Sequence, residues 1–502
     1  MGGESHCWLL LSFVFGGLVF LGACGGGPSK ASISGSSTDS SSGQSQSPDV
    51  PNSLSFTEIQ SGLDNQVNGT VDTWAPGTPR AVITSVGQFV INLLPGHSRN
   101  ALYFDLKFRP FNSNQWKTIA GPFVAACSDP TIVADSQGRI HLLYPQSDEH
   151  APDGQHCQSS GAEVIEAGNC HSGGNIWHSI ISYDGHNSPV IKAVSTKAIW
   201  GISDDQCSGG NPQSTQRFGI ATHSEENAIY LSFFRLSDSP QDKQMVARYD
   251  LNTDHWSSAV SIPTAYHSGQ GVGYSYVAGT TNASEVYMIS TVYDSAGQYT
   301  DVFLSHSLDS GKTWNVKRIC GMASIDPNDY HACLTIDILP QPDSGISFAV
   351  YMASTENAYS PMGDLVQGKN LPYLFSSDDG FKPHPIQSDS ALLQAYWHGN
   401  LFYTKSKQIA FIGDDATRHS PQLGLWHSTD KGKSWAYEDL GKWISSDSDR
   451  PHQSYQSQIL KAQYMGVSPS EWIPQTTFLG ILTDFIDSEH YRFLSFRLKT
   501  SL

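Results

Sequence analysis

The amino-acid sequence predicts an all-β protein built from a repeated unit. Only 15% of its 502 residues are charged, while 11% are aromatic and 45 are glycine. This composition favours strands, because helical proteins place Glu, Lys, Ala and Leu at exposed positions. One turn motif occurs twice in near-identical form and four times in degenerate form. Two short apolar or alternating stretches precede each copy, as expected of strands.

The apolar stretches assign the strands of each unit. We expect the innermost strands at 81–84, 131–134, 218–221, 274–277, 334–337 and 400–403. We expect their partners at 90–93, 140–144, 229–234, 286–290, 348–351 and 409–412. A last unit, with strands at 459–462, 478–483 and 491–498, lacks a fourth strand. The stretch 54–59, which precedes the first unit, is its natural donor.

The repeated turn has the pattern S-x-D-x-G-x-[ST]-W. Its two clear copies contain Ser307, Asp309, Gly311 and Trp314, and Ser428, Asp430, Gly432 and Trp435. We expect the Ser and Asp side chains to bond to turn amides, the glycine to take a positive φ, and the tryptophan to insert between neighbouring sheets. Degenerate copies occur at 112–116, 182–185, 250–256 and 376–381.

This motif resembles the Asp box, or BNR repeat, of sialidase-type β-propellers. The six copies lie about 64 residues apart on average, so residues 53–502 hold close to seven units. We therefore expect a seven-bladed β-propeller of four-stranded blades, closed by an N-terminal strand so that no long sheet edge is exposed. A six-bladed propeller, as in true sialidases, is the alternative.

The first 23 residues are similar to the signal peptide of a bacterial lipoprotein. The apolar run 8–21 is too short for a stable transmembrane helix, and the sequence Leu-Gly-Ala-Cys ending at Cys24 resembles a lipobox. The run departs from the usual pattern because no Lys or Arg precedes it. An ordinary signal peptide with an incidental Cys is the alternative.

The resemblance implies export and lipidation of Cys24, which would anchor the chain to a lipid bilayer in the outer membrane or at the cell surface. Residues 24–52 are rich in Ser and Gly and poor in apolar residues. Such a segment cannot offset its ordering entropy by burial, so we expect a flexible tether ahead of the propeller at 53–502.

The even number of remaining cysteines predicts disulfides, as expected in an exported protein. The equal separations of Cys157 from Cys170 and of Cys320 from Cys333 suggest two local bridges, which leaves Cys127 and Cys207. The alternative is a structural metal site formed by His156, Cys157, Cys170 and His171. No other cofactor is predicted.

The two faces of a propeller carry different connections. Turns after the first and third strands of each blade lie on one face, so the Asp boxes are predicted to be structural. The loops after the second and fourth strands lie on the other face, and here they are long and rich in His, Asp and Arg. Binding or catalysis is usually built in such loops.

Six residues of this second face are candidates for chemistry. Arg80, Arg217 and Arg418 are candidates for binding an anionic sugar, because guanidinium groups match carboxylates. Asp148 lies in an acidic stretch similar to the one that carries the general acid in some sialidases. Tyr330 and His331 have side chains suited to proton transfer, as in lyases that act on uronate glycans.

These observations predict a membrane-anchored propeller that recognises or cleaves glycans, most of all anionic ones. An enzyme would be a sialidase-like glycoside hydrolase or a polysaccharide lyase, although no Glu has the context of a sialidase nucleophile pair. The alternative is a non-catalytic module that binds a glycan or a surface protein. The net charge of −18 argues against nucleic acid as a partner. A monomer is expected.

Overall fold

The computed structural model of the chain describes part of the segment that follows residue 53. The described residues are 54–58, 65–66, 79, 81–84, 86–93, 102–110, 113, 115–125, 130–136, 138–146, 175–183, 189–192, 219–223, 225–235, 243–263, 271–293, 299–321, 332–353, 371–387, 399–403, 407–415, 422–442, 459–460, 462–464, 477–485 and 490–499. The predicted signal peptide, Cys24 and the tether lie outside them.

The prediction of an all-β protein is confirmed. The described residues form strands joined by turns, and the one helical element among them is the short 3-10 helix η4 (Ser377–Asp379). Neighbouring strands within the sheets pair antiparallel, with the exception of one parallel pair.

The described strands form seven sheets, and in sheets 1 to 6 the strands given below follow one another in the chain from the innermost outward, whereas the outermost strand of sheet 7 is β1. Sheet 1 contains β3 (Ala81–Ile83), β4 (Gly87–Leu93), β5 (Leu102–Pro110) and β6 (Lys117–Ala125). Sheet 2 contains β7 (Thr131–Ala134), β8 (Ile140–Gln146), β9 (Asn175–Tyr183) and β10 (Pro189–Lys192). Sheet 3 contains β11 (Gly219–His223), β12 (Ala228–Arg235), β13 (Lys243–Asp250) and β14 (His255–Trp256), with β15 (Val260–Ser261) also paired to β13.

Sheet 4 contains β16 (Gly271–Gly279), β17 (Val286–Tyr293), β18 (Tyr299–Ser307) and β19 (Asn315–Cys320). Sheet 5 contains β20 (Ala332–Pro340), β21 (Ile346–Ala353), β22 (Leu371–Ser376) and β23 (His384–Pro385). Sheet 6 contains β24 (Gly399–Tyr403), β25 (Ile409–Asp415), β26 (Gln422–Ser428) and β27 (Ala436–Lys442). Sheet 7 contains β28 (Ile459–Leu460), β30 (Thr477–Phe485), β31 (His490–Lys499) and β1 (Leu54–Glu58), with β2 (Asn65–Gln66) also paired to β31.

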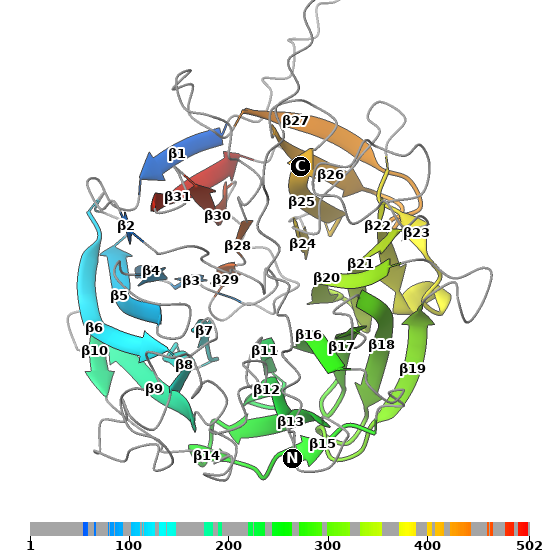
Figure 1. Cartoon of the computed structure of the whole chain (residues 1–502), viewed down its shortest axis with the longest axis horizontal. Helices are drawn as coiled ribbons and strands as arrows, with labels where there is room; N and C mark the ends of the chain where they lie inside the picture. Colours follow the sequence, from blue (N-terminus) through cyan, green and yellow to red (C-terminus); the bar gives the residue numbers. More distant parts are fainter. Residues whose placement is uncertain are drawn as a thin grey trace, which may run out of the picture. The chain divides into compact units, whose positions relative to one another are not determined.

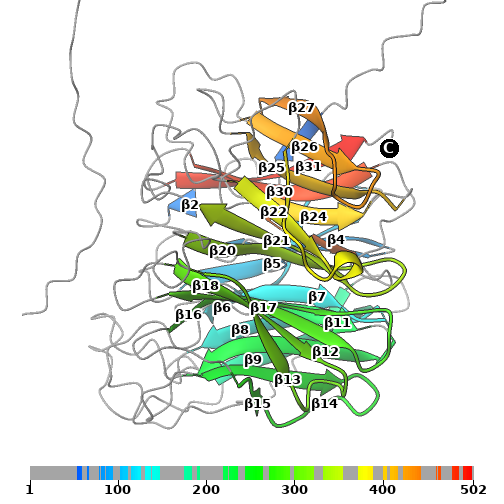
Figure 2. The ribbon, with the colours of Figure 1, turned by 90° about the vertical axis from the view of Figure 1, so that its right-hand side faces the viewer.

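The sheets are arranged radially, with their first strands innermost (Figure 1). The innermost strands contact one another in the order β3, β7, β11, β16, β20, β24 and β28. Figure 2 shows the strands from the side, running between two opposite edges of the sheets, with η4 at one of these edges. Each predicted innermost strand from 81–84 to 400–403 coincides with an observed one.

The predicted strand at 459–462 is divided in two. β28 pairs with β30 as the inner strand of sheet 7, whereas β29 (Ala462–Tyr464) crosses to sheet 1 and pairs parallel with β3. The predicted donor strand is present: β1 pairs antiparallel with β31 over five residue pairs, from Leu54 opposite Leu498 to Glu58 opposite Leu494.

The clear turn motifs have the hydrogen bonds expected from their sequence. Ser307 Oγ accepts from the Gly311 amide at 2.8 Å, and Asp309 Oδ1 accepts from the Thr313 amide at 2.8 Å. Gly311 has φ +78°, and Gly432 of the second copy has φ +88°. Hydrogen bonds from Thr313 lower the pKa of Asp309 to about 2. The side chains that give the motif its pattern therefore stabilise the turn itself.

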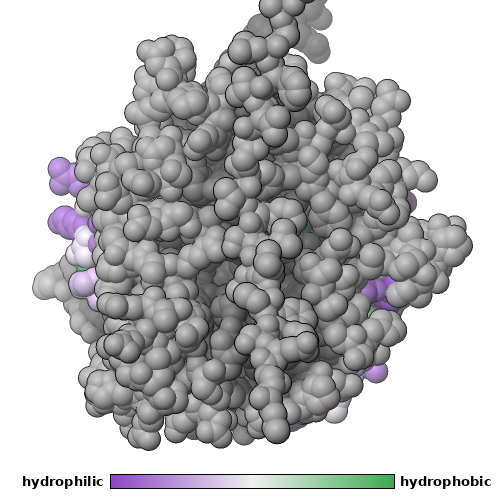
Figure 3. All heavy atoms as spheres, in the orientation of Figure 1, coloured by the Kyte–Doolittle hydropathy of each residue, from purple (hydrophilic) through white to green (hydrophobic). Residues whose placement is uncertain are grey.

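The motif tryptophans pack between sheets. Trp314 joins a buried cluster with Tyr230 and Val246 of sheet 3, and Trp435 joins one with Leu374 of sheet 5. Leu308 is the one large hydrophobic side chain that is exposed among the residues described. Hydrophilic residues prevail where described atoms reach the rim of the surface shown in Figure 3. The apolar side chains of these strands are thus used in packing sheet against sheet.

Candidate functional site

The strand ends divide each sheet into two edges. The hairpin turns after the first and third strands lie at one edge, which we call the turn edge. At the opposite edge, the innermost strand of each sheet begins and its second strand ends. We call this edge the loop edge.

Polar contacts between neighbouring sheets cover the turn edge. Ser136 Oγ donates to Asn227 Oδ1 at 2.6 Å between sheets 2 and 3, and Ser310 Oγ donates to Glu226 Oε1 at 2.6 Å between sheets 3 and 4. Lys407 Nζ lies 2.7 Å from Asp343 Oδ1 between sheets 5 and 6. Because these side chains bond to one another, the turn edge is best explained as a structural surface.

The six predicted site residues lie outside the described residues, and only their positions along the chain can be compared with the strands. Three of them come one or two residues before an innermost strand in the sequence: Arg80 before β3, Arg217 before β11 and His331 before β20. Tyr330 comes just before His331. The other two follow second strands, Asp148 after β8 and Arg418 after β25. Cys127, Cys157, Cys170, Cys207, His156 and His171 also lie outside the described residues.

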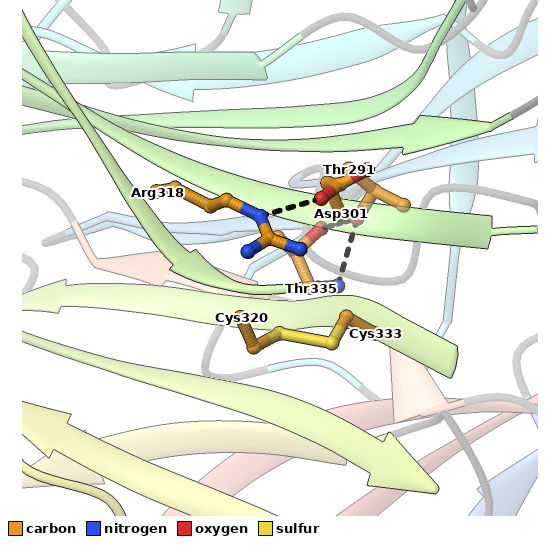
Figure 4. Close-up of a disulfide and its surroundings, with 6 residues drawn as sticks. All are labelled: Thr291, Asp301, Arg318, Cys320, Cys333 and Thr335. Atoms are coloured by element: carbon orange, nitrogen blue, oxygen red, sulfur yellow. Dashed lines mark hydrogen bonds and ion pairs between the residues drawn. A yellow bond between two sulfur atoms is a disulfide. The ribbon is translucent and has the colours of Figure 1, made fainter. Parts of the chain in front are cut away.

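A disulfide joins sheets 4 and 5 at the loop edge (Figure 4). It links Cys320, the last residue of β19, to Cys333, the second residue of β20, with Cα atoms 6.4 Å apart. Both cysteines are buried. In the sequence, Tyr330 and His331 fall between the two bonded cysteines.

An ion pair lies beside the disulfide. Arg318 Nε donates to Asp301 Oδ1 at 2.7 Å, and Asp301 is buried while one third of the Arg318 side chain is exposed. The guanidinium lies against Gly321, where any Cβ would overlap it. Figure 4 shows Arg318 reaching from β19 toward Asp301 on β18. The glycine after the disulfide therefore leaves the space that the Arg318 guanidinium occupies.

Two further contacts fix the inner strands beside this ion pair. Thr291 Oγ1 accepts from the Thr335 amide at 2.8 Å, and the two threonine hydroxyls are also 2.8 Å apart. Asp337 is fully buried, and its Oδ2 accepts from the Leu401 amide of sheet 6 at 2.9 Å. Amides of innermost strands that face the neighbouring sheet are thus satisfied by its side chains.

Asn400 differs from these groups because its side chain is buried with no hydrogen-bond partner among the described residues. It is the second residue of β24, only 3% of it is exposed, and neither its amide nitrogen nor its amide oxygen forms a hydrogen bond with this part of the chain. A buried amide left in this state costs about 1–3 kcal/mol, so its presence needs an explanation. Its location at the loop edge of an innermost strand makes it a candidate for binding a ligand or an ordered water.

Sheet 1 contains a buried carboxylate, that of Asp105, and both of its oxygens have partners. Asp105 Oδ1 accepts from Asn92 Nδ2 at 2.8 Å, and its Oδ2 accepts from Thr118 Oγ1 at 2.9 Å. Lys107 Nζ lies 3.3 Å from the same Oδ2. Because the carboxylate has partners on both oxygens, a structural role explains it.

The sequence did not single out Arg318, Asp301, Asp337 or Asn400. The alternation of strand residues would place Arg318 on the same side of β19 as Cys320, but the register of β18 and β19 shifts between them, so the two side chains lie on opposite sides of the sheet. The unpartnered state of Asn400 has no sequence signature, because it depends on which residues of other sheets surround it.

The described residues hold no group of three His, Cys, Asp or Glu side chains placed to bind a metal ion. In the same residues, no helix is both long enough and apolar enough to cross a membrane.

The chain matches no protein-family model and no curated protein. Solved structures are similar to it over most of its length. A polysaccharide lyase described as an ulvan lyase has a TM-score of 0.50 and 11% identity, covering 86% of this chain and 95% of that one. The same kind of lyase bound to a -[GlcA(1-4)Rha3S]- saccharide has a TM-score of 0.51 and 11% identity, with the same coverage.

The chain has the fold of a β-propeller. An α-L-arabinofuranosidase of Fusarium graminearum in complex with arabinobiose is also similar, with a TM-score of 0.40 and 12% identity, covering 88% of this chain and 97% of that one. At these identities the likeness concerns the fold, and function has to be argued from the site.

Proposed function

We propose that this propeller acts on an anionic glycan at its loop edge, as a lyase that cleaves a uronate-containing polysaccharide. The fold likeness to a lyase whose bound saccharide contains glucuronate carries this proposal. The sequence supports it, because the predicted Arg, Tyr and His residues adjoin, along the chain, strands that begin or end at the loop edge.

We infer seven blades closed by the N-terminal strand. The pairing of β1 with β31 supports this closure, since it completes the last sheet with a strand from the other end of the chain. The seven described sheets and the order of contacts among innermost strands support the blade number. A closed ring holds the loop edge rigid enough for a site to be built from several blades.

The proposed chemistry is β-elimination. Arg217 and Arg418 bind the uronate carboxylate, and their charge makes the proton at C5 more acidic. Tyr330 or His331 removes that proton as general base, while the other donates a proton to the leaving oxygen. The bond between C4 and that oxygen breaks, its electron pair leaves with the oxygen, and a C4–C5 double bond forms in the product. Asp148 and Arg80 are proposed to hold the neighbouring sugar.

We also propose that Cys24 is lipidated and anchors the propeller to a membrane after export. The tether of about 29 residues allows a reach of roughly 30 Å, by the scaling of flexible Ser- and Gly-rich chains. Replacing Cys24 by Ser should move the chain from the membrane fraction to the soluble fraction. Retention of the C24S chain in the membrane fraction would argue against this anchor.

Turnover of a panel of glycans tests the enzymatic proposal. The purified chain would be incubated with uronate polysaccharides, sialosides and arabinan, and formation of the C4–C5 double bond would be followed by ultraviolet absorbance. We expect product from a uronate polysaccharide only, and a loss of at least about a hundredfold in kcat/KM for Arg217→Ala, since a charge pair with the substrate is removed.

Lys433→Ala is a matched control, because Lys433 is an exposed cation on the turn edge. It should leave kcat/KM unchanged. Binding of a uronate glycan without turnover would replace the lyase by a recognition module. Release of sialic acid would instead favour a sialidase-like hydrolase, and equal effects of both substitutions would argue against a site at the loop edge.

A further inference from the structure

Two corresponding tryptophans of the turn edge differ in what accepts their indole hydrogen. Trp314 of sheet 4 donates from Nε1 to the Gly311 carbonyl at 2.9 Å, within its own turn. Trp256 of sheet 3 donates from Nε1 to His178 Nδ1 at 3.1 Å, which belongs to β9 of sheet 2. The outer part of sheet 3 is therefore joined to its neighbour through a side chain that can titrate.

The acceptor of Trp256 is the first link of a buried chain. His178 Nε2 lies 2.8 Å from His141 Nδ1, and His141 Nε2 lies 2.9 Å from Asp135 Oδ2. An indole nitrogen can only donate, so His178 Nδ1 carries no hydrogen and His178 Nε2 carries one. That hydrogen points at His141 Nδ1, which must accept, so His141 donates from Nε2 to Asp135. Both tautomers follow from the tryptophan.

The charged and titratable groups around the two rings are few. Asp135 and Arg139 lie at the His141 end, and Asp254 bonds both Arg139 and the Tyr249 hydroxyl. Tyr249 packs edge-on against both imidazoles. Burial lowers the pKa of His178 well below its ordinary value, and the charges of His141 and Arg139 lower it further. Burial also lowers the pKa of His141, against the opposing effect of Asp135.

The chain has no place for an additional proton. A proton on His178 Nδ1 would point at the Trp256 N–H. A proton on His141 Nδ1 would point at the His178 N–H, and if His178 then changed tautomer, its new Nδ1–H would again face Trp256. Every arrangement with one more proton on the two imidazole rings thus places two donors against each other, and the shift of tautomer moves this conflict to the contact between His178 and Trp256.

The segment that carries Trp256 pairs with its own sheet through short strands and single backbone bonds, such as those from the Ser257 amide to the Arg248 carbonyl and from the Ile262 amide to the Gln244 carbonyl, both at 2.8 Å. β14 and β15 are two residues each, and they pair with β13 at separate places. In sheet 4, the corresponding strand β19 is six residues long and pairs with β18 over most of that length.

We propose that the Trp256–His178–His141–Asp135 chain is an acid-sensitive latch, which holds the outer strands of sheet 3 against sheet 2 at neutral pH and releases them in acid before the whole propeller unfolds.

The direction of the effect follows from linkage. Because the folded-state pKa values of both histidines lie below the ordinary 6.5, the opened state binds more protons as the pH falls below about 6.5. The closed latch is therefore fully stable above that pH and loses stability progressively below it. For one histidine, the opening equilibrium rises roughly thirtyfold between neutral pH and pH 5.

Hydrogen exchange of the full chain at pH 7.5 and pH 5 measures this opening. After correction for intrinsic exchange, we expect residues 251–262 to lose protection by roughly thirtyfold, while residues 307–320 of sheet 4 keep theirs. The substitution His178→Gln supplies both an acceptor and a donor but cannot be protonated, so it should reduce the acid response of 251–262 to the part that His141 contributes.

Two tryptophan substitutions serve as a matched pair. Trp256→Phe should reduce the hydrogen-exchange protection of 251–262 already at pH 7.5, by about fivefold for one lost hydrogen bond. Trp314→Phe should reduce protection only in its own hairpin, and its effect should not grow in acid. Equal acid responses of 251–262 and 307–320 in the wild-type chain would overturn the latch, as would an acid response of undiminished size in His178→Gln.

A second measurement covers the case in which His178→Gln does not fold. Long-range proton–nitrogen spectra of the wild-type chain at pH 7.5 should show both histidines with the hydrogen on Nε2. A hydrogen on Nδ1 of either ring would overturn the proposal.

Discussion

At the scale of single residues, Asp430 and Asn400 show two different states of a polar side chain. Ser428 and Asp430 form their hydrogen bonds inside one turn: Ser428 Oγ accepts from the Gly432 amide at 2.7 Å, and Asp430 Oδ1 accepts from the Ser434 amide at 2.9 Å. Asn400, at the loop edge, forms none with the described residues. The first state stabilises the fold, whereas the second leaves a buried polar group unsatisfied.

Replacing Asp430 by Asn tests the role of the turn carboxylate. Burial alone would raise the pKa of Asp430, but hydrogen bonds from Ser434 and Ser428 lower it to about 2. The carboxylate therefore adds stability above about pH 4 that is lost as the pH falls toward 2. We expect Asp430→Asn to lower the free energy of unfolding by about 1 kcal/mol at pH 7, since the side chain is largely exposed and loses one bond from Ser434.

Denaturant unfolding at pH 7 and pH 2 measures this effect. The difference between wild type and Asp430→Asn should shrink at the lower pH. Glu225→Gln changes the charge of an exposed turn residue by the same amount and should have no effect at either pH. A difference that stays constant with pH would show that the carboxylate charge does not stabilise the turn.

Replacing Asn400 by Leu tests whether its unpartnered amide serves binding. An apolar side chain of similar size removes the buried polar atoms, so the free energy of unfolding should stay equal or rise by up to about 1–3 kcal/mol. Affinity for the glycan or kcat/KM should fall about tenfold, because a ligand hydrogen bond is lost. Thermal unfolding and steady-state kinetics measure the two effects.

Ser305→Ala is the matched control for Asn400→Leu. Ser305 is also fully buried with an unpartnered hydroxyl, but it lies in β18 two residues from the turn edge. It should gain stability without any loss of activity. A loss of stability in Asn400→Leu with unchanged activity would assign the amide a purely structural role.

At the scale of elements, the turns were predictable and the links between sheets were not. The S-x-D-x-G-x-[ST]-W turn is stabilised by residues within eight positions, so its chemistry can be read from the local sequence. The partner of Trp256 is His178, 78 residues earlier in the chain. Such a contact follows from the stacking of two sheets, which the sequence pattern does not specify at the level of single side chains.

Two glycine substitutions separate the backbone requirement of a turn from its packing. Gly380 and Gly432 both have positive φ, +75° and +88°. A Cβ at Gly380 would meet nothing within 4 Å, whereas one at Gly432 would overlap Leu374 of the neighbouring sheet. We expect Gly380→Ala to cost about 1–2 kcal/mol from backbone strain alone, and Gly432→Ala to cost about 1–3 kcal/mol more from overpacking.

Chemical denaturation of both variants measures this difference. Leu374→Ala in the Gly432→Ala background should recover part of the additional loss, because it makes room for the new Cβ. Equal costs for the two glycine substitutions would mean that this turn does not limit the packing between sheets 5 and 6.

At the scale of the whole molecule, the sequence predicted the repeat and the donor strand but not the arrangement of the loop edge. The six innermost strands and the pairing of β1 were predictable, because strand periodicity is local and an incomplete last unit requires a partner. The division of the segment 459–462 between sheets 7 and 1 was not, since a parallel pair with β3 has no local signal. Contacts between Asp301 and Arg318 likewise depend on how β18 and β19 are aligned.

Removal of β1 tests how far the ends of the chain stabilise the propeller. A chain that begins at residue 60 lacks the five pairs between β1 and β31, whereas a chain that begins at residue 53 keeps them. The shorter chain exposes the edge of β31, so we expect it to unfold at a temperature at least several degrees lower and to self-associate through the open edge. A synthetic peptide of residues 53–59 should restore part of the lost thermal stability. If the two chains unfold at the same temperature and remain equally monomeric by light scattering, the ring is held together by its inner contacts, and the N-terminal strand serves only to position the tether.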